Sequence, residues 1–180
     1  MIIIHMSPHE ERLLVQKAQQ GDREALGLLW DALTPKLYGY LLNVTHDKNL
    51  AQDMVQTTWL RVIDKFSQFR PRHPLSAWLF AIARNECRQH WRKAKHEASF
   101  DPAAHDVPSD EYKSVENHIL IDQILTRLSQ EDQEILRLRY IADFSLNDIA
   151  RILNLNFVTV RVRIHRALVR ARSAIISQPS

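Results

Sequence analysis

Apolar residues recur along most of the chain at spacings of three and four, the period of an α-helix with one buried face. Residues that favour helix starts precede several of these stretches, including Ser7, Asp22 and Asp47. The pattern predicts helices over residues 8–20, from Asp22 to before Pro35, over 37–44, 47–66 and 75–93. The short β-branched runs lie within these helical periods, so no strand is expected and the predicted fold class is all-α.

Core and surface positions follow from the same periodicity. The helix over 47–66 places Ala51, Met54, Val55, Thr58 and Val62 on its core side, and Gln52, Asp53 and Gln56 on its other side. Trp30, Trp59 and Trp78 stand at helical spacing with leucine and isoleucine, so they are expected in the core.

The stretch 144–172 is typical of a helix-turn-helix. Ser145 can cap the first helix, and Asp148 three residues later completes a capping-box pattern. Leu146, Ile149, Ala150 and Leu153 give this helix an apolar stripe. Asn154 tolerates a left-handed conformation and can end it, and Asn156 is a suitable cap for the second helix.

The second helix of this motif carries an unusual charge pattern. Its expected buried face contains Val160, Ile164, Ala167, Leu168 and Ala171, and its opposite face contains Arg161, Val162, His165, Arg166 and Val169. Arg163 and Arg170 lie on one flank, and no Asp or Glu follows Phe157. A tightly presented basic helix favours reading of the DNA major groove. A solvated basic helix in a bundle is the alternative.

Charge is distributed unevenly along the 180 residues. The net charge is +5 over residues 1–95, −7 over 96–132 and +5 over 133–180. Residues 95–113 contain two prolines and no apolar period, so they are expected to form a flexible acidic linker. The prediction is therefore two helical bundles, 8–94 and 114–177, and two separate contacts with a polyanion. A helix starting at Ser114 opens the second bundle, and Ser129 caps the next helix, with Ile135, Leu136, Leu138 and Ile141 in its core.

Composition excludes several classes of protein. Apolar residues make up 45% of the chain, which supports packed cores. A single cysteine allows no internal disulfide framework and favours a reducing compartment. The apolar opening 2–4 is too short for a signal peptide or a membrane span, and three glycines form no phosphate-binding loop.

The helix over 75–93 ends in a second basic segment. Residues 84–93 interleave Arg84, Arg88, Arg92 and Lys93 with Asn85 and Trp91. Cations follow phosphates, rings stack on bases and amides read base edges, so this segment suits single-stranded nucleic acid.

With both bundles described, the chain resembles bacterial sigma factors of the extracytoplasmic-function group. The resemblance covers about residues 8–177. It rests on AQQGDREALGLLWDALTPKLYGYL (18–41), AQDMVQTTWLRVIDKF (51–66), PLSAWLFAIARNECRQHWRK (74–93) and the segment 125–172. The chain departs from the family in having Asp143 and Asn154 where glycine is common, and Val158 and Val162 where small or polar residues are usual.

The resemblance implies a promoter-recognition subunit that binds core RNA polymerase and promoter DNA. Gln52, Asp53 and Gln56 would contact the polymerase clamp. Arg84, Asn85, Arg88, Trp91, Arg92 and Lys93 would meet the minus-ten element. Thr159, Arg161, Val162, Arg163, His165 and Arg166 would bind the minus-thirty-five element. The family also implies an anti-sigma partner and a cytoplasmic, nucleoid-associated location, with no cofactor and no membrane insertion.

Two other classes of function are weighed against this one. A repressor or activator would share the helix-turn-helix and would usually dimerise, whereas a monomer that binds core polymerase favours the sigma factor. For an enzyme, Cys87 and His90 are three apart on one helix, but no second pair completes a four-ligand metal site. No nucleophile motif surrounds the serines, so no catalytic residue is predicted.

Overall fold

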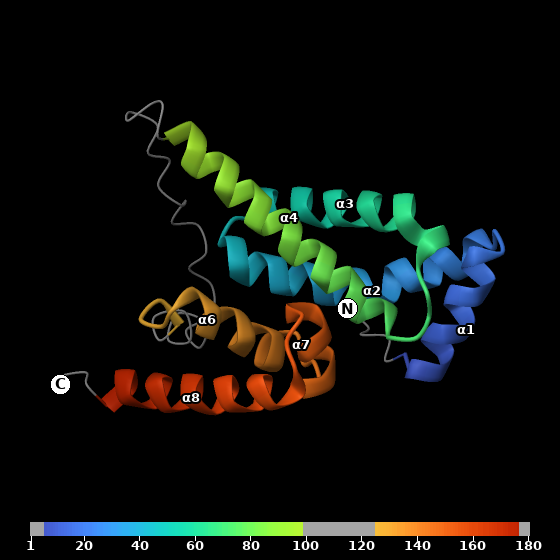
Figure 1. Ribbon diagram of the computed structural model, residues 1–180. Coiled ribbons are helices and arrows are strands. Elements are labelled where there is room, and N and C mark those ends of the chain that lie inside the picture. Colours follow the sequence, from blue (N-terminus) through green and yellow to red (C-terminus); the bar gives the residue numbers. More distant parts are fainter. Residues whose placement is uncertain (1–5, 99–124, 177–180) are drawn as a thin grey trace. The chain divides into compact units, whose positions relative to one another are not determined.

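The computed structural model describes residues 6–98 and 125–176, and every regular element within them is a helix (Figure 1). Contacts divide the chain into two compact units, residues 1–109 and 110–180. The predicted all-α fold with two helical bundles is confirmed. Most of the predicted linker and the helix expected from Ser114 lie outside the described residues. Residues 95–98 of that linker belong to a helix instead.

The first unit is built from long helices that follow one another along the chain. They are α1 Pro8–Gln19, α2 Arg23–Thr45, α3 Lys48–Lys65 and α4 Leu75–Ala98, with the 3₁₀ turn η1 Phe66–Gln68 after α3. Each helix packs on the next, and α4 also contacts α1 and α2. The almost fully buried side chains come from all four: Val15, Leu29, Leu37, Leu41, Trp59, Val62, Leu75, Leu79 and Phe80.

Local capping starts three of these helices where the sequence predicts. The backbone N–H of Ser7 donates to Glu10 at 2.8 Å and that of Glu10 donates to the Ser7 hydroxyl at 3.3 Å, completing a capping box. The hydrogen bonds from the Ser7 side chain and backbone lower the pKa of the Glu10 carboxyl. Asp22 accepts from Ala25 N–H at 3.0 Å, and Asp47 caps α3 in the same way.

The prediction that Pro35 separates two helices is wrong, because α2 continues through it. Proline inside a helix removes one backbone hydrogen bond and costs about 3 kcal/mol. Apolar residues nevertheless keep helical spacing across Pro35, and Leu29, Leu33, Leu37 and Leu41 are all buried. Burial of this continuous stripe against α1 and α3 outweighs the local penalty.

The expected tryptophan core is only partly observed. Trp59 is buried, and its indole N–H donates to the Thr34 hydroxyl at 3.0 Å. Trp30 is 37% exposed and lies against Trp59, with ring centroids 4.7 Å apart. Trp78 is half-buried and stacks on the buried Phe69 at 4.8 Å. Trp30 is therefore a surface residue with one face covered, which helical spacing alone does not reveal.

The second unit contains the predicted helix-turn-helix and the helical segments that precede it. These are α6 Gln130–Leu136, a π-helical segment η2 Arg137–Ile141, α7 Leu146–Leu153 and α8 Phe157–Ile176. α8 packs on α6 and α7. The core of the second unit is formed by side chains that are at most 3% exposed: Ile135, Leu138, Ala142, Phe144, Ile149, Ile152, Val160 and Ala167.

The turn between α7 and α8 forms as the sequence predicts. Asn154 ends α7 in the left-handed conformation, with φ 53° and ψ 48°. Asn156 caps α8 by accepting the backbone N–H of Thr159 at 2.7 Å. Ser145 caps α7 by accepting Asp148 N–H at 3.2 Å, and its hydroxyl donates to the Asp148 carboxylate at 2.6 Å. These local bonds fix where α8 begins.

Some core positions in this unit differ from the prediction. Ile141, the last residue of the π-helical segment, is 36% exposed, because the segment departs from the α-helical period on which the prediction rests, and Ala142 and Phe144 are buried instead. Leu168 is 41% exposed at the edge of the α8 stripe. On α7, Ile152 is buried, whereas the predicted Leu153 is only half-buried.

Candidate nucleic-acid interface

The outward face of α8 carries the predicted DNA-contacting side chains. Val160, Ile164 and Ala167 turn inward against α6 and α7. The residues on the opposite side are exposed, as their helical positions predict: Arg161, Val162, His165 and Arg166. Thr159 is half-buried beside the Asn156 cap. The buried stripe and the two caps therefore orient one cationic face toward solvent.

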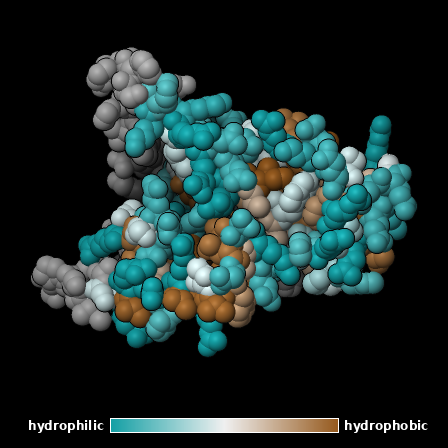
Figure 2. All heavy atoms as spheres, in the orientation of Figure 1, coloured by the Kyte–Doolittle hydropathy of each residue, from teal (hydrophilic) through white to brown (hydrophobic). Residues whose placement is uncertain are grey.

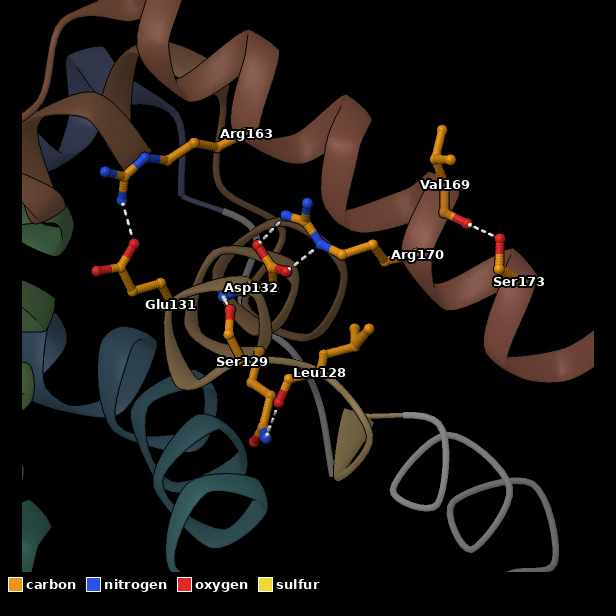
Figure 3. Close-up of polar contacts among 9 residues, drawn as sticks. Leu128, Ser129, Glu131, Asp132, Arg163, Val169, Arg170 and Ser173 are labelled. Carbon is orange, nitrogen blue, oxygen red and sulfur yellow. Dashed lines mark hydrogen bonds and ion pairs between the residues drawn. The ribbon is translucent and has the colours of Figure 1, made fainter. Parts of the chain in front are cut away.

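Two arginines on the flank of α8 are held by acids of α6 (Figure 3). Arg170 donates two hydrogen bonds to the Asp132 carboxylate at 2.6 and 2.8 Å. The Asp132 side chain is only 7% exposed, whereas that of Arg170 is about half exposed. The hydrogen bond to Asp132 raises the pKa of Arg170 above its ordinary value. Arg163 donates to Glu131 at 3.0 Å.

These pairs fix α8 on its partner helix. Ser129 caps α6 by accepting the backbone N–H of Asp132 at 3.3 Å, so the carboxylate that receives Arg170 sits on an ordered first turn. A bidentate arginine–carboxylate pair also fixes orientation, because two parallel hydrogen bonds define one geometry. The sequence places Arg163 and Arg170 correctly on a flank, but it does not reveal their acidic partners on α6.

A second row of polar and cationic groups lies on the C-terminal half of α4. Ala83 and Cys87 are buried and turn this part of the helix onto the core. Asn85, Arg88 and Arg92 stand at spacings of three and four, so they form one exposed row on the other side. Of the remaining predicted residues, Lys93 is exposed, Arg84 is half-buried and Trp91 is 42% exposed. The structure thus groups these residues on the accessible part of α4.

Residues of α1 hold the loop that leads into α4. The buried Glu11 carboxylate accepts the backbone N–H of Leu75 at the start of α4. The Gln19 amide donates to the carbonyls of Phe66 and Phe69 at 2.9 and 2.8 Å. A cavity of about 50 Å³ between α1 and the loop has room for only one or two water molecules. The loop is therefore anchored by direct contacts.

The anchored loop presents cations that the sequence interpretation leaves unassigned. Arg70, Arg72 and His73 are exposed on it. Their spacing follows no helical or strand period, and their position beside α4 depends on the contacts made by Glu11 and Gln19, which are distant in sequence. The charge of this loop is the one sequence signal that could have drawn attention to it.

The exposed face of α3 combines polar and apolar groups. Gln52, Asp53 and Gln56 are exposed, whereas the predicted core residues of α3 are buried. Leu60 and Ile63 are 68% and 50% exposed. They follow Gln56 by four and seven residues, so they extend the same face. The sequence interpretation missed both, although apolar residues outside the core stripe were a detectable signal.

Two other kinds of site are tested within the described residues. No group of three or more His, Cys, Asp or Glu side chains there is placed to hold a metal ion, and Cys87 is buried. No helix among those residues is both long and apolar enough to span a membrane.

Comparison with protein families gives two matches in chain order. Residues 29–97 match the family described as Sigma-70 region 2, and residues 118–170 match Sigma-70, region 4. The first match contains the candidate faces of α3 and α4, and the second contains α8 up to Arg170.

Curated relatives cover most of the chain at modest identity. The chain is 28% identical over 164 residues to the ECF RNA polymerase sigma factor BldN of Streptomyces coelicolor, covering 86% of this chain and 62% of that protein. It is 28% identical over 177 residues to the RNA polymerase sigma-H factor of Pseudomonas aeruginosa, covering 90% of this chain and 92% of that one.

Solved structures share the fold. CnrH in complex with the cytosolic domain of CnrY matches with a TM-score of 0.73 at 23% identity, covering 94% of this chain and 99% of that one. The sigma factor RpoE, in complex with the anti-sigma factor NepR from Bartonella quintana, matches with a TM-score of 0.72 at 24% identity, covering 86% and 98%.

Proposed function

Because this chain belongs to the extracytoplasmic-function group of sigma-70 factors, we infer that it binds core RNA polymerase and directs it to promoters. The observation that carries this inference to particular residues is the exposed basic face of α8, presented by a capped helix-turn-helix. Its function is binding: phosphate contacts position the subunit and base contacts specify the sequence.

We propose that the second unit binds the minus-thirty-five duplex through α8. Arg161, His165 and Arg166 lie on the outward face, and the start of a recognition helix is the part that reaches base edges. Thr159 and Val162 stand on the same N-terminal half. Arg163 contacts Glu131 and lies to the side, so it serves the phosphate backbone.

In this proposal, the first unit binds the minus-ten element and core polymerase. The row of Asn85, Arg88 and Arg92 on α4 meets the minus-ten element as its strands separate, with Arg84, Trp91 and Lys93 at its sides. Gln52, Asp53 and Gln56 on α3 contact core polymerase. The combination of cations, an amide and an exposed ring on α4 suits unpaired bases and their phosphates.

Partners and location follow from the same proposal. RpoE is bound by an anti-sigma factor in its solved complex, and we extend such a partner to this chain as a protein that covers its interaction faces. In this proposal the chain acts in the bacterial cytoplasm at the nucleoid, and its task is binding.

Transcription in vitro tests this function directly. Purified chain is added to core polymerase on a library of promoter-length duplexes, and transcripts are sequenced to find start sites. The expected result is initiation that depends on the chain and shares two upstream sequence elements. Duplex binding by a dimer without any polymerase-dependent transcript would contradict the sigma-factor function and support a repressor.

A further inference from the structure

We propose that Val158 and Val162 of α8 recognise thymine methyl groups in the upstream duplex, which makes these two valines specificity-determining residues. The proposal rests on the inferred role of α8 in promoter binding. Both side chains are accessible, at 67% and 40% exposed. Single exposed apolar residues are common on protein surfaces, so the argument depends on where these two lie.

The two valines lie in the middle of the face that α8 offers to DNA. Four residues correspond to about 400° of helical rotation, so Val162 stands about 40° round from Val158 and about 6 Å further along the axis. Arg161 and Arg166 lie on the two sides of this row. Figure 2 shows hydrophobic surface along the α8 side of the second unit, interrupted by hydrophilic side chains.

The position of the valines along α8 suits base contact. α8 starts at Phe157, and Asn156 caps it, so Val158 and Val162 belong to its first turns. The N-terminal residues of a recognition helix are those that enter the major groove. A separation of about 6 Å corresponds to one or two base-pair steps of about 3.4 Å.

The chemistry of the groove selects the contact. Among the base edges in the major groove, the C5-methyl of thymine is the apolar group, and the other groups are hydrogen-bond donors and acceptors. A valine side chain offers no hydrogen bond, so a cytosine or guanine edge opposite it would lose its water without compensation. Thymine is the base that gains from the contact.

DNA fits this surface better than a second protein chain does. The valines are flanked by Arg161 and Arg166, and α8 contains no acidic residue. Two copies of this face would bring like charges together, whereas a phosphate backbone beside the groove complements them. A protein partner on the valines is the competing occupant.

The test removes only the methyl group. Holoenzyme made from the full chain and core polymerase is used to select upstream duplexes from a random pool, and the thymines of the preferred duplex are replaced one at a time by deoxyuridine. We expect affinity to fall about threefold to fourfold at one or two positions within a few base pairs, the effect of burying one methyl-sized group. Unchanged affinity at every position would overturn the proposal.

Substitutions assign the effect to the valines. For each duplex position, the ratio of the affinity with thymine to the affinity with deoxyuridine is measured. In Val158→Ala and Val162→Ala this ratio should approach one at the position that the substituted valine contacts. Because alanine favours helix, folding is preserved. Val169→Ala is the matched control: Val169 is 53% exposed but about 18 Å beyond the start of α8, so its ratios should match those of the parent.

Two further outcomes overturn the proposal. In the first, the thymine-to-deoxyuridine affinity ratios of Val158→Ala and Val162→Ala stay at the parental value, while sedimentation shows altered self-association or altered binding of a protein partner. This result would assign the valines to protein contact. If the holoenzyme selects no duplex at all, the inferred function of the chain fails together with this proposal. If it selects duplexes but binds thymine and deoxyuridine equally, only this proposal fails.

Discussion

The arginines of α8 differ in what they already contact. Arg170 is held by the buried Asp132 carboxylate and Arg163 by the exposed Glu131. Within the described part of the chain, no ion pair forms to Arg161 or Arg166. In the proposed function, these two guanidinium groups would therefore reach DNA without leaving an acid of the described residues, whereas Arg163 would exchange Glu131 for a phosphate.

Substitution should separate base contacts from backbone contacts. Arg161→Ala and Arg166→Ala should each weaken holoenzyme binding to a matched upstream duplex by about 1–3 kcal/mol and relax specificity at one position. Arg163→Ala should weaken matched and mismatched duplexes alike. Titration of both duplexes with each variant measures this, and equal losses on both for all three variants would show that Arg161 and Arg166 do not read bases.

At the scale of helices, sequence signals succeed where the deciding interactions are local. Ser145, Asn154 and Asn156 set the ends of α7 and α8 through bonds within a few residues, and all three act as predicted. The continuation of α2 through Pro35 and the π-helical segment around Leu138 are not predicted, because packing against other helices determines the backbone conformation there. Their outcome depends on partners that no short window of sequence contains.

The candidate sites show the same division. Helical periodicity places the exposed faces of α3, α4 and α8 correctly, because each face is the complement of a buried stripe. The hydrogen bonds that hold the loop before α4 against α1 come from Glu11 and Gln19, and their partners Leu75 and Phe66 are distant in sequence. The roles of these faces in binding stay predictions.

The α3 face yields a prediction for the polymerase contact. Asp53→Lys and Leu60→Ala should reduce affinity for core polymerase while the free energy of unfolding changes by less than about 0.5 kcal/mol, as for most surface substitutions. Asp31→Lys, an exposed acid on α2, is the control and should keep parental affinity. Thermal unfolding and polymerase titration give the two readouts. A lowered melting temperature with unchanged polymerase binding would make these residues structural.

For the whole molecule, two basic regions on separate units imply two different tasks at one promoter. In the proposed function, the α8 face meets a closed duplex, whereas the α4 row meets strands that have come apart. A double-stranded site is read in its groove, and unpaired bases are held by stacking and phosphate contacts. Variants of the two faces should therefore fail at different steps.

A template with a preformed bubble distinguishes those steps. Arg88→Ala with Arg92→Ala should reduce transcription from duplex promoters, and a mismatched minus-ten bubble should restore much of it because strand separation is no longer required. Arg161→Ala with Arg166→Ala should stay impaired on both templates. Arg23→Ala, an exposed arginine on α2, is the control. An equal defect of the α4 variant on duplex and bubble would contradict its role in opening.

The burial of Cys87 has a practical consequence for spectroscopy. It is the only thiol in the chain and is 4% exposed within the core of the first unit. A maleimide dye added to the folded protein should therefore react at an introduced surface cysteine, such as one replacing Ser67 or Ser173, and leave the native residue unmodified. Distances between the two units can then be followed by fluorescence energy transfer during promoter binding, without altering the native core.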